Sequence, residues 1–293
     1  MTVLHRRLRH VTVGHVVILV FLTVFALMIL LPFVNAITVS FISQEEYLQN
    51  KLTLFPKEPT LKAYERIFRE DWLWPAYRNT IFISVVGLVY CITINCLTAY
   101  AITRQFPLKK LFYLILLIPM FFSGGLIPTY LLMVRLGLKN TFGALILPAG
   151  VSTYYLMIMS TFFRDLPPSL EESARLDGAG EFRILWSIIL PLSKSVIATI
   201  SLFIVVGFWN DWFGALIYLD KPLMWPLQLH LRRIINEATS SMADRENTLM
   251  QVKVYAEGVR MASVLVTMVP IMCVYPFLQK YFAKGVMIGA VKG

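Results

Sequence analysis

Long apolar runs separated by short polar pieces dominate the pattern of this 293-residue chain. A helix needs about 20 mostly apolar residues to cross the hydrocarbon core of a bilayer. Six runs reach that length, and Leu, Ile, Val, Phe and Met follow one another in them without the two-residue alternation of a strand. Because backbone groups in lipid must be paired internally, the pattern predicts transmembrane helices. The predicted spans cover residues 16–40, 79–102, 111–133, 142–163, 193–219 and 262–283.

Composition agrees with this pattern. Hydrophobic residues make up 57% of the chain and charged residues 15%, against roughly 25% charged residues in soluble domains. We therefore expect an all-α polytopic membrane protein with a single transmembrane domain over residues 1–293. Two polar outer segments, 42–76 and 220–258, are long enough for structure of their own. Prolines within the runs predict kinks at Pro32, Pro119, Pro128, Pro148, Pro270 and Pro276.

The first run follows basic residues, as the apolar core of a signal peptide does. It is longer than such a core and has no A-x-A cleavage pattern at its end, which favours a retained first span. With both termini in the cytoplasm, the inner loops receive most Lys and Arg residues, as the positive-inside rule requires. These residues are Arg6, Arg7, Arg9, Arg104, Lys109, Lys110, Arg164, Arg175, Arg183, Lys194, Lys280, Lys284 and Lys292.

The net charge of +10 is mostly this inside bias. No basic stripe interleaved with aromatic residues occurs in a polar segment, so the sequence gives no support for nucleic-acid binding. Cys91, Cys96 and Cys273 all fall in apolar runs without a CxxC pattern or a neighbouring histidine. They are interpreted as packing residues, and the sequence predicts no disulfide framework and no metal site.

A cytoplasmic elbow over residues 166–191 lies between the fourth and fifth predicted spans. Ser169 with Glu172 matches the S-x-x-E capping box, which predicts a helix start directly after two prolines. The helix is expected to end at Asp177-Gly178, where glycine permits a turn. A second short helix is expected from about Glu181 to the Leu190-Pro191 pair.

The first elbow helix combines small and acidic residues. Ser173, Ala174 and Ala179 allow close approach of another chain, as does the turn glycine, while Glu172 and Asp177 can pair with basic groups. Such an elbow can dock into a groove of a soluble partner and transmit motion. It can equally be an amphipathic linker without a partner, and spacing alone does not separate the two interpretations.

The same segment resembles the coupling-helix signature of bacterial ABC importer permeases, which reads E-A-A, Gly, nine residues and I-x-L-P. Glu172-Ser173-Ala174 occupies the first element, with Ser173 where the family usually has alanine. Gly178 follows four residues later, and nine residues separate it from Ile188, Leu190 and Pro191. The resemblance implies that this segment docks onto a cytoplasmic ATPase dimer.

Further segments resemble the carbohydrate branch of these permeases, whose members include importers of oligomers of acidic polysaccharides such as rhamnogalacturonan and alginate. They are Ala99-Tyr100-Ala101 followed by basic residues, the stretch 122–132, Tyr275 to Lys280 and the tail from Lys284 to Gly293. The resemblance implies an oligosaccharide importer in the cytoplasmic (inner) membrane of a bacterium. It also implies three protein partners: a second permease subunit, the ATPase dimer and an extracytoplasmic solute-binding protein.

No G-x-x-x-x-G-K-[ST] phosphate loop occurs, so ATP and Mg²⁺ are expected on the partner ATPase and no cofactor on this chain. The resemblance implies alternating access, in which closure of the ATPase dimer moves the elbow. By the same analogy the tail, with Lys284, Gly285, Gly289 and Gly293, reaches between the ATPase subunits. A frayed terminus is the alternative interpretation.

The fifth predicted span contains a polar pair between two tryptophans, Trp209-Asn210-Asp211-Trp212. Ionisable groups within a span are candidates for a functional site, and aromatic rings beside amides suit the faces of sugars. Capping of a helix break, with the tryptophans in an interfacial belt, is the alternative. Tyr130, Tyr154 and Tyr155 are weaker candidates for the substrate path and are better explained as packing residues.

Two other functional classes compete with an ABC permease. A secondary transporter or channel predicts several intramembrane ionisable groups, whereas only Asp211 stands out. An intramembrane enzyme needs a nucleophile with a base or a set of metal ligands, and no H-E-x-x-H motif or comparable group occurs. We therefore predict that the chain is a transport subunit without catalytic activity.

Overall fold

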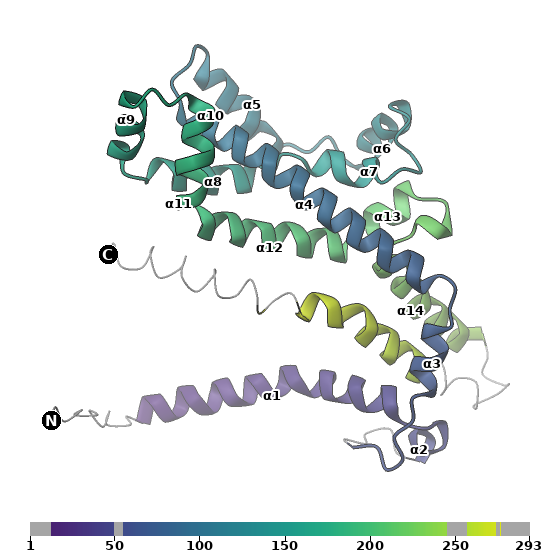
Figure 1. The fold of residues 1–293 in the computed structure, drawn as a ribbon. Coiled ribbons are helices and arrows are strands. Elements are labelled where there is room, and N and C mark those ends of the chain that lie inside the picture. Colours follow the sequence, from purple (N-terminus) through teal and green to yellow (C-terminus); the bar gives the residue numbers. More distant parts are fainter. Residues whose placement is uncertain (1–12, 50–54, 245–256, 274–275, 277–293) are drawn as a thin grey trace. The chain divides into compact units, whose positions relative to one another are not determined.

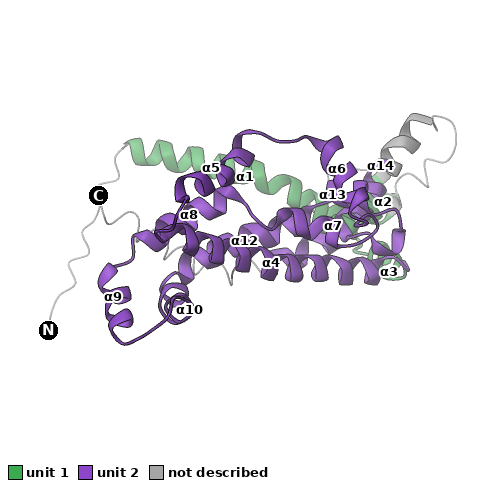
Figure 2. Ribbon diagram, turned by 90° about the horizontal axis from the view of Figure 1, so that it is seen from above, with its two compact units in different colours: residues 1–69, 238–265 green, residues 70–237, 266–293 purple. Residues whose placement is uncertain are grey.

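The computed structural model describes residues 13–49, 55–244, 257–273 and 276, and all regular structure within them is helical (Figure 1). The all-α prediction is confirmed for this part of the chain. The chain divides into two compact units, residues 1–69 with 238–265 and residues 70–237 with 266–293 (Figure 2).

The first unit contains α1 (Val13–Phe41), α2 (Gln44–Gln49) and α3 (Lys62–Phe68). With 29 residues, α1 is long and apolar enough to cross a membrane, and it continues through Pro32. Its end is joined to the following polar segment by a bond from the Thr60 amide to the Phe41 carbonyl, 2.8 Å long. The first predicted span is therefore confirmed as one helix.

The central helix of the second unit is α4 (Leu73–Thr103), which runs for 31 residues without a break and is also apolar enough to cross a membrane. Helices α8 (Thr153–Arg164) and α12 (Lys194–Asn210) pack against it. The core between these helices includes Cys91 and Cys96, both buried, which agrees with a packing role for these thiols.

Shorter elements complete the second unit and lead back into the first. The α-helices are α5 (Lys109–Phe121), α6 (Leu126–Arg135), α7 (Gly143–Ile146), α9 (Pro168–Leu176), α10 (Glu181–Ile184), α11 (Leu190–Leu192), α13 (Phe213–Tyr218), α14 (Leu227–Asp244) and a helix over residues 257–273. The others are the 3-10 helices η1 (Leu147–Ala149) and η3 (Pro222–Met224) and the π-helix η2 (Leu185–Ile189).

Three predicted spans are not single helices. The span at 111–133 consists of α5 and α6, which meet at 115° across Phe122–Gly125, and the span at 142–163 bends by 45° between η1 and α8. In the span at 193–219, α12 ends at Asn210 and α13 begins at Phe213. The sequence placed kinks at Pro119, Pro128 and Pro148, but the structure has full interruptions. Residues 274–275 and 277–283 of the sixth predicted span lie outside the described residues.

The two polar segments predicted to lie outside the membrane, 42–76 and 220–258, contain helices within their described residues. In the second of them, His230 stacks on Trp72 with ring centroids 4.6 Å apart, and Trp225 lies 5.3 Å away. Burial lowers the pKa of His230 to about 4, so this imidazole is neutral at pH 7. The pair of rings holds the start of α14 against the N-terminal end of α4.

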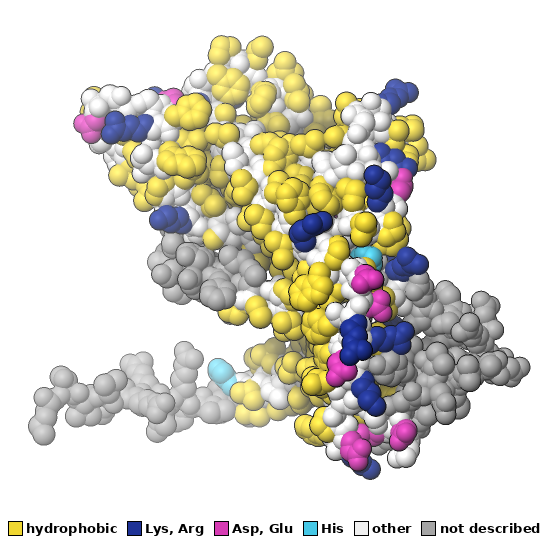
Figure 3. Space-filling model, turned by 45° about the vertical axis from the view of Figure 1, so that its right-hand side comes forward, with side chains coloured by type: hydrophobic (Ala, Val, Ile, Leu, Met, Phe, Trp, Pro, Cys, Tyr) yellow, Lys and Arg dark blue, Asp and Glu magenta, His cyan; other side chains and the backbone are white. Residues whose placement is uncertain are grey.

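Many large hydrophobic side chains of the described residues are exposed at the surface. Figure 3 shows hydrophobic side chains over most of the visible face and charged side chains in small groups. No residue of α5 is buried within the described part of the chain. Such a surface is suited to contact with lipid or with another apolar chain.

Asn95, a fully buried residue of α4, forms hydrogen bonds with backbone groups at the bend before α8. Its amide nitrogen donates to the Gly150 carbonyl at 2.9 Å and to the Cys91 carbonyl at 2.7 Å. Its oxygen accepts from the Ser152 amide at 3.2 Å. One side chain therefore replaces the helical partners of two backbone groups that would otherwise be unpaired in an apolar core.

We expect Asn95→Ala to destabilise the protein by about 2–4 kcal/mol, because it leaves the Gly150 carbonyl and the Ser152 amide buried without partners. Thermal unfolding in detergent measures the loss. Thr199→Ala is the matched control, since the Thr199 hydroxyl bonds only to the Ser195 carbonyl of its own helix. Equal unfolding temperatures for the two variants would contradict the role given to Asn95.

Candidate functional site

The elbow begins with α9, whose first residue is Pro168. The N-cap residue, Pro167, makes no side-chain cap bond, so the predicted Ser169–Glu172 capping box is wrong. The helix begins at Pro168 because proline suits the first helical position, where a backbone amide would have no partner. Ser169 consequently lies inside the helix instead of before it.

The turn after α9 is confirmed at the predicted glycine. Gly178 has φ +79°, in the left-handed region, and its amide donates to the Arg175 carbonyl at 3.0 Å. The Ala179 amide donates to the Ala174 carbonyl at 2.9 Å. These two bonds form a Schellman motif, which fixes the angle at which the chain leaves the helix.

The second arm of the elbow differs from the predicted helix. α10 is followed by the π-helix η2 and then by α11. Pro191 has no amide to complete an α-helical bond, and the wider π turn lies directly before it. Ile188 and Leu190 are half-buried, with Leu190 packed against the core, and Pro191 is exposed.

Acidic residues of the elbow fall into two groups. Glu172 and Asp177 are exposed on α9 and its turn, and neither forms an ion pair within the described residues. Glu171 and Glu181 instead bind arginines of the same chain, Arg104 and Arg175. Sequence reasoning assigned pairing to Glu172 and Asp177 and did not single out Glu171 or Arg104.

The elbow also exposes three large apolar side chains that the sequence analysis did not single out. Leu176, Phe182 and Trp186 are 89%, 81% and 74% exposed. The signal that could have found them is a large apolar residue in an otherwise polar segment. Of the small residues, Ser173 is exposed, whereas Ala174 and Ala179 are half-buried against the core.

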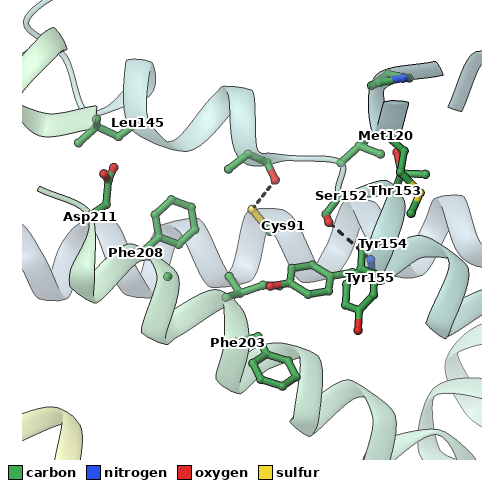
Figure 4. Close-up of a pocket in the computed structure, with 15 residues that line it drawn as sticks. Cys91, Met120, Leu145, Ser152, Thr153, Tyr154, Tyr155, Phe203, Phe208 and Asp211 are labelled. Atoms are coloured by element: carbon green, nitrogen blue, oxygen red, sulfur yellow. Dashed lines mark hydrogen bonds between the residues drawn. The ribbon is translucent and has the colours of Figure 1, made fainter. Parts of the chain in front are cut away.

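A cavity of about 570 Å³ lies among α4, α5, α8 and α12 of the second unit (Figure 4). Its lining is mostly apolar and aromatic, with Asp211 as its carboxylate among the described residues. The lining residues are Cys91, Pro119, Met120, Leu145, Ala149, Val151, Ser152, Thr153, Tyr154, Tyr155, Phe203, Ile204, Gly207, Phe208 and Asp211.

Of the predicted path residues, Asp211, Tyr154 and Tyr155 line the cavity. Trp209 is buried elsewhere and donates to the Thr267 carbonyl at 3.2 Å. Asn210 donates to the Val206 carbonyl of its own helix at 3.0 Å. Trp212 lies under the guanidinium of Arg232, 4.5 Å from the ring centroid, and Tyr130 stacks on Tyr218.

Asp211 lines the cavity and also pairs backbone at the break between α12 and α13. Its carboxylate accepts from the Gly214 amide at 2.9 Å, in the first turn of α13. The tail residues Lys284, Gly285, Gly289 and Gly293 lie outside the described residues.

The chain matches known transport proteins over nearly its whole length. A family model described as "Binding-protein-dependent transport system inner membrane component" matches residues 3–288. Protein LplC of Bacillus subtilis is 42% identical over 90% of both chains. The polygalacturonan/rhamnogalacturonan transport system permease protein YtcP of the same organism is 38% identical, covering 93% of this chain and 96% of its own.

Solved structures agree. One chain of a bacterial ABC transporter involved in the import of the acidic polysaccharide alginate superposes with a TM-score of 0.83 at 30% identity. The match covers 94% of this chain and 98% of that one. A second chain, from the alginate transporter in complex with an alginate pentasaccharide-bound periplasmic protein, has a TM-score of 0.60 at 16% identity and supports the fold alone.

We expect Asp211→Ala to destabilise the protein by about 1 kcal/mol, because the Gly214 amide loses its acceptor. Asp211→Asn keeps an acceptor oxygen and is expected to unfold at the wild-type temperature in detergent. Thr199→Ala is again the control, since the Thr199 hydroxyl donates to the Ser195 carbonyl of the same helix. Equal destabilisation by Asp211→Asn and Asp211→Ala would contradict a capping role.

Proposed function

Because the chain belongs to the family of inner membrane components of binding-protein-dependent transport systems, we propose that it is a pore-forming permease subunit of an ATP-driven oligosaccharide importer. The observation that carries the proposal is the family match over residues 3–288, together with an exposed elbow held at a fixed angle by its Schellman turn.

Acidic oligosaccharides are the proposed cargo. Support comes from YtcP, named for polygalacturonan and rhamnogalacturonan, and from the transporter structure named for alginate. The aromatic lining of the cavity suits sugar rings, since rings stack on C–H faces. The Asp211 carboxylate is directed to the Gly214 amide, which reduces its repulsion of an acidic sugar.

The proposed topology has six spans in the cytoplasmic membrane of a bacterium, with both termini and the elbow in the cytoplasm. Support comes from Arg164, Arg175, Arg183 and Lys194, which flank or lie within the elbow. Three of the six spans are then broken helices, and the sixth includes the helix over residues 257–273.

A second permease subunit is proposed to cover the break between α5 and α6. Residues 121–128 are all exposed, and the amides of Ser123 and Gly124 make no hydrogen bond within the described residues. Non-helical backbone at membrane depth is tolerated only where protein covers it or where it lines a water-filled path. Unlike the bend at Asn95, this break therefore requires groups from outside the described chain.

The elbow is proposed to dock into a cleft of a cytoplasmic ATPase dimer. The exposed Glu172 and Asp177 are available to basic groups there, and Leu176 provides an apolar anchor at the tip. The ATPase supplies the ATP and Mg²⁺ site, and the tail from Lys284 to Gly293 reaches between its subunits. An extracytoplasmic solute-binding protein delivers the cargo on the opposite side.

The proposed mechanism is alternating access. ATP binding closes the ATPase dimer, the elbow transmits that closure to the spans, and the cavity opens toward the loaded binding protein. Hydrolysis returns the spans to the inward-open state. This chain contributes the path and the elbow, and the chemistry of hydrolysis belongs to the partner.

We expect Gly178→Val to lower transport about tenfold or more while membrane insertion is retained, because valine at φ +79° disrupts the turn. Transport is measured in proteoliposomes containing the full importer, with ATP inside and oligogalacturonate as cargo. Gly180→Val is the matched control: Gly180 has φ −72° and an added Cβ meets nothing within 4 Å.

Normal transport by Gly178→Val would contradict the coupling role of the elbow. Transport by the wild-type permease without the ATPase or without ATP would contradict an ABC importer and favour a secondary transporter or channel. A wild-type importer that moves only uncharged malto-oligosaccharides of the same length would contradict the proposed acidic cargo.

A further inference from the structure

The C-terminal end of α4 is bound to both arms of the elbow by one arginine. Arg104, the residue directly after α4, pairs through Nη1 with the Glu171 carboxylate of α9. Its Nε lies 3.2 Å from the Glu181 carboxylate at the start of α10. Arg104 is separated from Glu171 by 67 residues in sequence, so the fold brings it to the elbow.

Neighbouring groups hold this arginine in place. The guanidinium lies over the Tyr100 ring, 4.1 Å from its centroid, and the Tyr100 hydroxyl donates to the Glu181 carboxylate at 2.6 Å. The Arg104 and Glu171 side chains are only 25% and 20% exposed. A planar guanidinium that hydrogen-bonds one carboxylate, lies within ion-pair distance of a second and stacks on a ring is more tightly constrained than an exposed ion pair.

The opposite end of α4 is bound as firmly. The Asn79 side chain donates to the Leu223 carbonyl at 2.8 Å, and the Thr80 hydroxyl accepts from the Leu227 amide at 2.8 Å. Between these two ends α4 is unbroken, whereas α8 and α12 lie beside breaks. α4 therefore connects the elbow to the segment 222–227, so that a displacement of the elbow can be transmitted along this helix.

We propose that Arg104, with Glu171 and Glu181, forms a clamp that makes α4 and both arms of the elbow move as one body. Arg104 is then the positioning residue through which movement of the elbow reaches the far side of the unit. This inference rests on the proposed function, because it assigns to α4 the transmission that the elbow begins. It does not require Arg104 to touch either the ATPase or the cargo.

The experiment compares Arg104→Gln with Arg175→Gln in the complete importer in proteoliposomes. Arg175 also binds Glu181, at 2.5 Å, but it lies on α9 and does not connect to α4. We expect R104Q to retain assembly and basal ATP hydrolysis while oligosaccharide moved per ATP falls about tenfold. R175Q is expected to change that ratio less than about twofold, since its side chain is half exposed.

A double-mutant cycle separates a clamp from general damage to the protein. Glu171→Gln removes the same contact from the other side, so R104Q and E171Q are expected to lower the ratio alike, and R104Q/E171Q no further than either. Arg104→Lys keeps the charge without the planar fork and is expected to give an intermediate ratio. It also serves as the second variant if R104Q does not assemble.

A wild-type ratio in R104Q or R104K, or additive losses in the double variant, would overturn the clamp. If instead the wild-type importer shows no ATP-dependent transport, the proposed function fails and the clamp fails with it. If the wild type transports with ATP and R104Q is unaffected, only the clamp is lost.

Discussion

Pairing of backbone amides and carbonyls in apolar surroundings is the constraint on which the rest of this structure depends. A continuous helix such as α4 satisfies it by itself, but a broken span must find other partners. At the bend before α8 the partner is Asn95, which bonds both Gly150 and Ser152. At the break after α12 it is Asp211, which accepts from Gly214. At the break over Phe122–Gly125 the Ser123 hydroxyl accepts from the Gly125 amide, but the amides of Ser123 and Gly124 have no partner within the described residues, and this difference is the ground for the proposed second subunit.

In the elbow, backbone pairing at the turn is combined with ion pairs between side chains. Its turn pairs backbone through a Schellman motif at Gly178, and its arms are held together by ion pairs of Glu171 and Glu181. These pairs leave Glu172 and Asp177 exposed. One set of charged side chains therefore holds the arms of the elbow together, while a separate set is exposed on its surface.

Local patterns predicted much of this arrangement. Hydrophobic runs placed α1 and α4 correctly, and the turn glycine was found because glycine tolerates positive φ. The capping box failed because proline suits the first helical position, so the helix begins at Pro168 and Ser169 lies inside it. The π turn before Pro191, the interruption at Phe122–Gly125 and the pairing of Arg104 with Glu171 could not be predicted, because they depend on contacts between distant segments. The path residues were chosen by chemical type, whereas Trp209 and Tyr130 are occupied in packing.

The cavity and the broken helices have a common origin. Ala149, Val151 and Ser152 line the cavity from the bend before α8, and Asp211 lines it from the break after α12. A continuous helix at either place would direct side chains into this space and pair its own backbone there. Where the helices are interrupted, those side chains are absent. Asn95 and Asp211 then supply hydrogen bonds to the backbone groups that the interruption leaves unpaired. The unbroken α4 runs alongside, so the unit combines one continuous helix with neighbours that are interrupted where the cavity lies. The proposed coupling through the elbow would act on this combination.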